Sequence, residues 1–264
     1  MDLVLLLTAL ILGVVEGLTE FLPVSSTGHL IIVGDFLGFT DAHAKTFEIF
    51  IQLGAILAVV WHYRQRLASF VAGLNQSVAQ RFWLNLTIAF VPAALVGLAL
   101  HKQIKAYLFN PMAVAGALIV GGVIILLIER TPRRARVQDL ESLRPSDALK
   151  IGVAQTLSLF PGVSRAGATI MGGLLTGLSR TTATEFSFFL AIPTMLAATS
   201  YELITSRHVL SPENTALFTV GFVTAFVTAL IVIRAFLAYV AHHNFAAFAY
   251  YRIVFGLLVL IYFW

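Results

Sequence analysis

The sequence predicts an all-α fold: a polytopic membrane helix bundle with an inverted-topology repeat, two re-entrant helix–loop–helix hairpins and about six full transmembrane helices. Three observations support this prediction. The 264-residue chain is 59% hydrophobic and only 11% charged, which excludes a soluble domain. Its apolar runs are more continuous than barrel strands, which alternate over about ten residues. A polar motif also occurs twice within the apolar sequence.

The repeated motif occupies residues 13–30, GVVEGLTEFLPVSSTGHL, and residues 152–169, GVAQTLSLFPGVSRAGAT. Aligned without gaps, the copies share the pairs Gly13/Gly152, Val14/Val153, Leu18/Leu157, Phe21/Phe160, Val24/Val163, Ser25/Ser164 and Gly28/Gly167. Ionisable groups inside an apolar bundle are costly, so those in the motif are functional candidates. A Pro/Gly/Ser break at matching places in two halves also points to a site near the membrane midplane.

The first hydrophobic region of each half, residues 3–37 and residues 149–180, is broken near its middle by this motif. Each flank is too short to span a membrane comfortably. Irregular backbone at membrane depth is tolerated only where protein covers it or where it lines a wet cavity. We therefore expect two re-entrant hairpins whose tips meet inside the bundle, with small residues such as Gly13 and Gly172 allowing close helix contacts.

The remaining apolar segments are long enough to cross the membrane. They are residues 47–63, 83–100, 112–128, 185–205, 216–240 and 245–264. Each half then contains one hairpin followed by three crossings. Since a hairpin returns to its own side and three crossings do not, the halves are expected to be inverted. We predict a single integral-membrane domain over residues 1–264, with repeats at about 1–128 and 149–264 joined by a linker at 129–148.

The basic residues predict the orientation. One side would hold Arg64, Arg66, Arg81, Arg130, Arg133, Arg134, Arg136, Arg144, Lys150 and Arg234, and the other only Lys45, Lys102, Lys105 and Arg207. By the positive-inside rule the first side is cytoplasmic, which places the linker inside and both termini outside. We interpret the linker charges as a solvated connector. The basic residues lie between apolar runs without interleaved aromatics, so nucleic-acid binding is not expected.

Glu16 and Glu20 are four residues apart, so on a helix both carboxylates project from one face. Two adjacent carboxylates suit a divalent cation, or a base with an electrostatic partner. The alternative is an unimportant solvated helix end. We favour a functional pair because both acids adjoin an apolar run and lead directly into the break.

Residues 23–29 of the first copy supply hydroxyls, backbone N–H groups and an imidazole. A Ser/Thr/Gly-rich turn that opens a helix is a good anion-binding site. Ser25, Ser26 and Thr27 could instead simply cap that helix, and both interpretations can hold for different hydroxyls. Beside two carboxylates, His29 is a candidate acid, base or nucleophile rather than a packed polar residue.

The second copy offers the hydroxyls of Ser164 and Thr169 and the guanidinium of Arg165. Arginine binds phosphate bidentately and stays charged when buried. A snorkelling loop arginine is the alternative, but Arg165 aligns with Ser26 in the middle of the first motif. Carboxylates, hydroxyls, an imidazole and an arginine together suggest phosphoryl transfer from a lipid-borne phosphate.

The segments EGLTEFLPVSSTGH and PGVSRAGAT closely resemble the two signature segments of the undecaprenyl-diphosphate phosphatase (bacitracin-resistance) family. The resemblance covers essentially the whole chain, including TFEIFIQLGAILAVV and TEFSFFLAIP. It implies hydrolysis of undecaprenyl diphosphate to undecaprenyl phosphate and inorganic phosphate, which recycles the carrier lipid for peptidoglycan synthesis and confers bacitracin resistance. It also implies a metal-assisted enzyme of the bacterial inner membrane, and in that membrane the outside position that the basic residues predict for both termini is periplasmic. The functional residues it implies are Glu16, Glu20, Ser26, His29, Ser164, Arg165 and Thr169.

One position departs from the family pattern, because the second motif commonly reads PGxSRS and here ends in Ala166. No hydroxyl can therefore be essential at this position, while Arg165 is unaffected.

From these residues we expect Arg165 and the N–H groups near Ser164 and Ser26 to hold the two phosphates, with Ser26 as nucleophile and Glu20 as its activator. His29 would protonate a leaving oxygen or orient water. Glu16 and Glu20 would bind Mg²⁺ or Ca²⁺. The other expected substrate-binding residues are Ser25, Thr27 and Thr169. Attack by His29 or by metal-bound water uses the same residues and stays open.

A transporter is the rival function, because inverted repeats with broken helices are typical of alternating-access carriers. A carrier needs no serine between a carboxylate and an arginine, so we favour the enzyme. The expected partners are a polyprenyl diphosphate substrate and membrane lipid, and a homodimer is compatible with the sequence.

Overall fold

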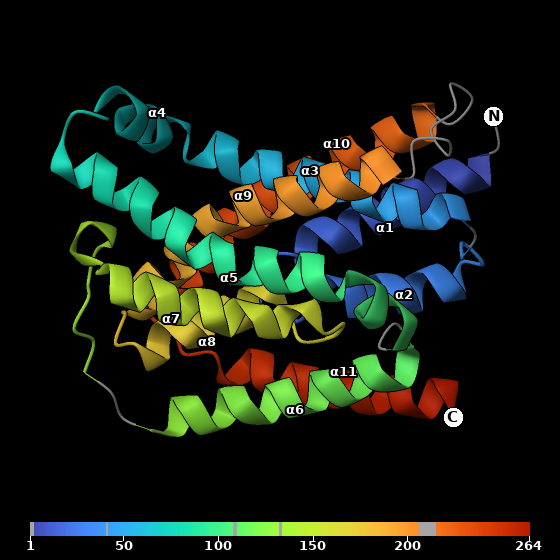
Figure 1. The fold of residues 1–264 in the computed structure, drawn as a ribbon. Coiled ribbons are helices and arrows are strands. Elements are labelled where there is room, and N and C mark those ends of the chain that lie inside the picture. The colour runs from blue at the N-terminus through green and yellow to red at the C-terminus, as the bar shows by residue number, and fades with distance from the viewer. Residues whose placement is uncertain (1–2, 41, 108–109, 132–133, 206–214) are drawn as a thin grey trace.

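The computed structural model describes residues 3–40, 42–107, 110–131, 134–205 and 215–264, and these ranges form helices joined by turns (Figure 1). The elements are α1 (Leu3–Thr19), α2 (Ser26–Phe36), α3 (Ala42–His62), α4 (Arg64–Ala72), α5 (Ser77–Tyr107), α6 (Pro111–Arg130), η1 (Leu140–Ser142), α7 (Pro145–Thr156), η2 (Leu157–Leu159), α8 (Arg165–Leu175), α9 (Arg180–Thr205), α10 (Thr215–Val240) and α11 (Ala246–Phe263). The described ranges contain no strand, only one isolated bridge between Val137 and Leu178. The all-α prediction is confirmed.

Four helices of the described part are long and apolar enough to cross a membrane: Ser77–Leu100 within α5, and α6, α10 and α11. Thr46–His62 and Arg64–Ala72 form a fifth candidate that is bent by 68°. Five of the crossings expected from the sequence therefore match a candidate span of the structure. The crossing expected at residues 185–205 lies in α9, which is not among these candidates and which carries Arg180, Glu185 and several hydroxyl side chains.

The two motif-containing regions break where the sequence predicts. α1 ends at Thr19 and α2 begins at Ser26, while α7 and η2 lead into the second break and α8 begins at Arg165. α1 contacts α2 and α7 contacts α8, so each region folds back on itself. Figure 1 shows α1 and α2 towards the end of the bundle where both termini lie. Residues 134–144 lie at the opposite end.

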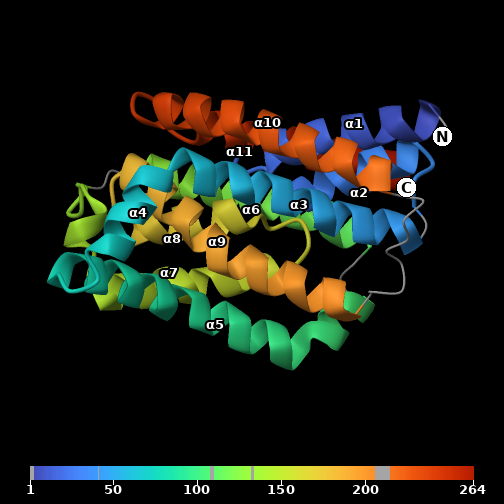
Figure 2. The ribbon, with the colours of Figure 1, turned by 90° about the horizontal axis from the view of Figure 1, so that it is seen from above.

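Close helix packing builds the rest of the bundle. α1 and α3 pack against α10, α6 packs against α11, and α5 packs against α7. Figure 2 shows α1 and α10 along one edge and α5 and α7 along the opposite edge. A Cβ added at Gly13 would lie 2.6 Å from the Gly221 carbonyl oxygen, and one at Gly172 would lie 2.7 Å from the Ala154 Cβ. These glycines therefore permit the close contacts that the sequence predicts.

The charged residues of the linker segment 134–144 are exposed, whereas its valine and leucine residues are not. Val137 and Leu140 are buried. The Arg136 amide donates to the Gly177 carbonyl at 2.7 Å, which attaches the linker to the turn after α8. The sequence made no prediction for these apolar linker residues, and burying them removes apolar surface from water. Arg133, Arg207 and the loop at 206–214 lie outside the described residues.

Candidate functional site

Each break ends in the same turn. Ser25 has φ 71° and Ser164 has φ 74°, in the left-handed region that non-glycine residues rarely adopt. The Gly28 amide donates to Ser25 Oγ at 3.4 Å, and the Gly167 amide donates to Ser164 Oγ at 3.0 Å. Both serines are therefore N-caps. For Ser25 the sequence offered this interpretation, and for Ser164 it did not. The turn places the next residue at a helix N-terminus, at the tip of its hairpin.

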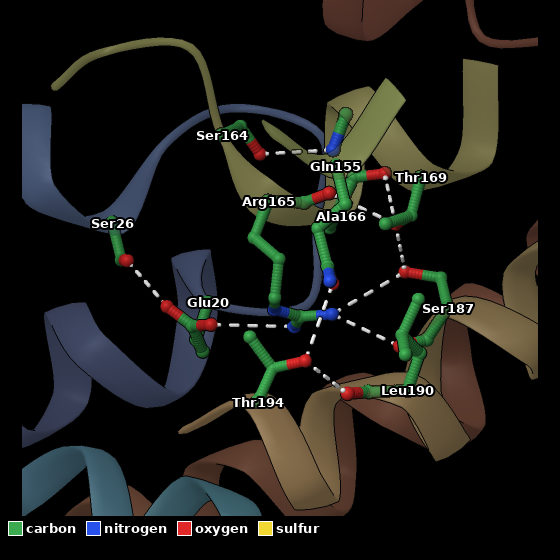
Figure 3. Close-up of polar contacts among 11 residues, drawn as sticks. Glu20, Ser26, Gln155, Ser164, Arg165, Ala166, Thr169, Ser187, Leu190 and Thr194 are labelled. Carbon is green, nitrogen blue, oxygen red and sulfur yellow. Dashed lines mark hydrogen bonds and ion pairs between the residues drawn. The ribbon is translucent and has the colours of Figure 1, made fainter. Parts of the chain in front are cut away.

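Those next residues, Ser26 and Arg165, converge on Glu20 (Figure 3). Ser26 Oγ donates to Glu20 Oε2 at 2.5 Å, and Arg165 Nη2 donates to Glu20 Oε1 at 3.3 Å. All three side chains are buried. One carboxylate thus bridges a hydroxyl of the first motif and a guanidinium of the second, so the expected meeting of the tips is present for these residues. A carboxylate that accepts from a hydroxyl is placed to take its proton.

Arg165 is held in place from α9. Its Nη1 donates to the Ser187 carbonyl at 2.9 Å and lies 3.4 Å from Ser187 Oγ (Figure 3). Thr169 Oγ1 lies 2.7 Å from Ser187 Oγ and 2.8 Å from the Arg165 carbonyl. Thr169 therefore supports the arginine and its anchor. The Arg165 Nε group is buried without a hydrogen-bond partner in the described part of the chain, which leaves this donor for a ligand.

Glu16 has a different environment from Glu20. It is fully buried, and neither carboxylate oxygen has a hydrogen-bond partner within the described ranges. Its counterpart in the second motif, Gln155, is also buried but lies within hydrogen-bond distance of Ala89 O and Thr194 Oγ1. An unpaired buried carboxylate is costly unless a cation or a proton neutralises it.

Glu16 and Glu20 therefore fit the expected divalent cation, with Glu16 free to coordinate. The described residues contain no group of three or more His, Cys, Asp or Glu side chains arranged around a metal site. Two carboxylates still suit Mg²⁺, which commonly binds through one or two carboxylates, several waters and substrate phosphates.

His29 follows Ser26 by one helical turn but points to α11. Its Nδ1 lies 2.7 Å from the Ser25 carbonyl oxygen and its Nε2 lies 2.6 Å from the Tyr251 hydroxyl. The ring also stacks on Phe255, with centroids 4.1 Å apart. His29 thus shares the turn with Ser26, while its own hydrogen bonds connect it to Ser25 and Tyr251.

The remaining predicted residues lie around this cluster. Thr27 is half-buried and makes no side-chain hydrogen bond within the ranges that the structure describes. Ala166, the departure from the family pattern, is fully buried in the hydrophobic core. A hydroxyl at that position would lie among apolar side chains.

The sequence analysis missed Arg252 of α11, which is almost fully buried. Its Nη1 donates to Pro23 O at 3.0 Å and to Val163 O at 2.9 Å, and its Nη2 donates to Gly162 O at 3.0 Å. It also donates to the Ala117 and Leu118 carbonyls of α6. One guanidinium therefore connects both hairpin tips to the α6/α11 pair. The signal was present, because Arg252 is a charge in the middle of a predicted span.

Comparisons with known proteins identify the family. The family model described as bacitracin resistance protein BacA matches residues 9–258. A protein of Methylobacillus flagellatus named undecaprenyl-diphosphatase is 57% identical over 270 residues, covering 100% of both chains. One of the same name from Dechloromonas aromatica is 56% identical over 261 residues, covering 98% of this chain and 95% of its own. A third, from Nitrosomonas europaea, is 55% identical over 261 residues and covers 99% and 96%.

These matches extend over both motifs and all apolar helices, so the likeness is not confined to one segment. The chain is a multi-pass helical membrane protein, and it belongs to the bacitracin resistance protein BacA family.

Proposed function

We propose that the chain is an undecaprenyl-diphosphate phosphatase, a phosphoric anhydride hydrolase that forms undecaprenyl phosphate and inorganic phosphate. The curated relatives carry this activity in their names. The observation that carries the proposal is the buried contact of Ser26 and Arg165 with one carboxylate, Glu20. Such a cluster has the parts that phosphoryl transfer needs: a nucleophile, its base and a positive charge near the phosphates.

In the first step Ser26 Oγ attacks the terminal phosphorus and transfers its proton to Glu20. The Oγ–P bond forms, the P–O bond of the anhydride breaks, and undecaprenyl phosphate leaves as an anion. Arg165 stabilises the charge that develops on the phosphate oxygens. In the second step water attacks the phosphoserine. Ser26 regains its proton from Glu20, and inorganic phosphate is released.

A divalent cation would be held by Glu16 and Glu20, and it would neutralise diphosphate charge and polarise the phosphoryl oxygens. The unpaired carboxylate of Glu16 supports this assignment. His29 would orient the attacking water or accept its proton.

We further propose that the protein resides in the bacterial inner membrane, with re-entrant hairpins, six crossings and a site that opens to the periplasm. The positions of the termini and of residues 134–144 at opposite ends of the bundle support this orientation. Cysteines at the exposed positions Thr40 and Gln138 would test it, because the native chain has no cysteine. An impermeant thiol reagent added to spheroplasts should modify a cysteine at Thr40 and spare one at Gln138. The reverse pattern would contradict the orientation.

Phosphate release from undecaprenyl diphosphate by the purified protein tests the activity. The wild-type protein should release inorganic phosphate, and Ser26→Ala should not. Ser69→Ala is a matched control, because Ser69 is exposed and, among the described residues, its hydroxyl donates only to the Arg66 carbonyl in α4. Wild-type protein that transports the lipid but releases no phosphate would favour a carrier instead.

A further inference from the structure

Tyr251 of α11 is the partner of His29 across the bundle. Its hydroxyl lies 2.6 Å from His29 Nε2, although the two residues are far apart in the sequence. The ring is 47% exposed, so it lies at the edge of the buried cluster. The next residue, Arg252, is anchored to both hairpin tips, and this fixes the backbone from which Tyr251 reaches the histidine.

The two contacts of His29 define its tautomer. A backbone carbonyl only accepts hydrogen bonds, so the contact with the Ser25 carbonyl requires a proton on Nδ1. A neutral imidazole carries one N–H group, so Nε2 then holds a lone pair and accepts the hydrogen bond of the Tyr251 hydroxyl.

The ring is also prevented from turning. Tyr251 lies nearly parallel to the imidazole, with centroids 5.6 Å apart and an interplanar angle of 2°. Phe255, one turn further along α11, stacks on it at 4.1 Å with an angle of 11°. The orientation of Nε2 is therefore set by α11, while the position of the imidazole is set by α2.

We propose that Tyr251 positions His29 for the hydrolysis: its hydroxyl and ring keep His29 in the Nδ1–H tautomer, and Nε2 takes up a proton through the Tyr251 hydroxyl that donates to it. This inference rests on the proposed phosphatase function. When water attacks the phosphoserine, the water oxygen forms the new bond to phosphorus and the Oγ–P bond breaks. The proton of water passes to the Tyr251 oxygen while the Tyr251 hydroxyl proton passes to His29 Nε2 and then to solvent, and Ser26 recovers its own proton from Glu20.

Tyr251→Phe tests the role of the hydroxyl, because it keeps the stacked ring and removes only the O–H donor. In the full-length purified protein we expect kcat to fall about tenfold, the effect of one lost hydrogen bond to a charged or reacting group, with KM within about twofold of the wild type. Tyr250→Phe is the matched control: Tyr250 adjoins Tyr251 in α11, is exposed, and makes no side-chain hydrogen bond within the described residues. It should leave both constants unchanged.

A second measurement does not depend on turnover. Diethyl pyrocarbonate acylates neutral imidazole nitrogens, and mass spectrometry can follow the reaction at His29. Freeing Nε2 should make His29 react faster in Tyr251→Phe than in the wild type and in Tyr250→Phe. Tyr251→Leu, which also removes the stacking, should react at least as fast.

The outcomes separate this inference from the proposed function. If the wild type hydrolyses the diphosphate but Tyr251→Phe keeps the wild-type kcat, the positioning role is refuted. An unchanged acylation rate at His29 in both Tyr251 variants also refutes it. A wild-type protein that releases no phosphate refutes the proposed function and the catalytic part of this inference, and the acylation rates still decide whether Tyr251 holds His29.

Discussion

Displacing the Arg252 guanidinium without changing its charge is expected to impair catalysis, and Gly121→Ala does this. A Cβ on Gly121 in α6 would overlap the Arg252 side chain, so the guanidinium must move. Gly116→Ala is a matched control in the same helix, because a Cβ there would have no heavy atom within 4 Å.

The structure sets the size of the effect. Moving the guanidinium leaves the hairpin carbonyls of Pro23, Gly162 and Val163 without this donor. A buried acceptor that is left unpaired costs about 1–3 kcal/mol, so the three together cost at least about 3 kcal/mol. Alanine is favoured over glycine within a helix by about 0.5–1 kcal/mol, which offsets part of this loss. We therefore expect a net destabilisation of about 2 kcal/mol for Gly121→Ala.

Two assays check this prediction. Thermal unfolding in detergent should show a Tm lower by about 5 °C for Gly121→Ala and no decrease for Gly116→Ala. Phosphate release should fall about a hundredfold in kcat/KM, because the tips carry Ser26 and Arg165 and a shift of about 1 Å can cost that much. Equal Tm and activity in the two alanine variants would refute the view that Arg252 holds the tips together.

Three further predictions concern the cluster itself. Ser26→Ala should abolish turnover in a folded protein, whereas Ser25→Ala should lose only about 1 kcal/mol of local stability, because Ser25 is a cap; modest and equal effects would point to His29 or water as the attacking group. Glu16→Gln should raise the Mg²⁺ or Ca²⁺ concentration needed for half-maximal activity, and an unchanged metal titration would show that Glu16 is not a ligand. Arg165→Lys should be nearly as inactive as Arg165→Ala, since an ammonium lacks the planar fork; a fully active lysine variant would rule out bidentate binding.

Local features of the fold and site were predictable from the sequence. The Pro/Gly/Ser breaks and the cap at Ser25 follow from short-range backbone chemistry, which a linear motif displays directly. The contact of both motifs with one carboxylate was expected from the duplication, because Ser26 and Arg165 occupy equivalent positions of the two copies and the tips were predicted to meet.

Long-range contacts were not predictable in the same way. Tyr251 and Arg252 reach the site from α11, and Ser187 reaches it from α9. Arg252 was visible only as a charge inside a span and Ser187 only within TEFSFFLAIP, and neither signal reveals the partner of the side chain. The sequence did not predict that the His29 side chain points towards α11, because its hydrogen-bond partner Tyr251 comes from the far end of the chain. The linker burial depends on contacts with α5 and with the turn after α8, which local composition does not reveal.

The central claim is that Ser26 is the nucleophile in a cluster with Glu20 and Arg165. Rapid chemical quenching of the enzyme with undecaprenyl diphosphate labelled at the terminal phosphate tests it most directly. Digestion and mass spectrometry should find phosphate on Ser26 in the wild type and none in Ser26→Ala, which should also fail to turn over. Label on His29, or wild-type turnover by Ser26→Ala, would contradict the claim.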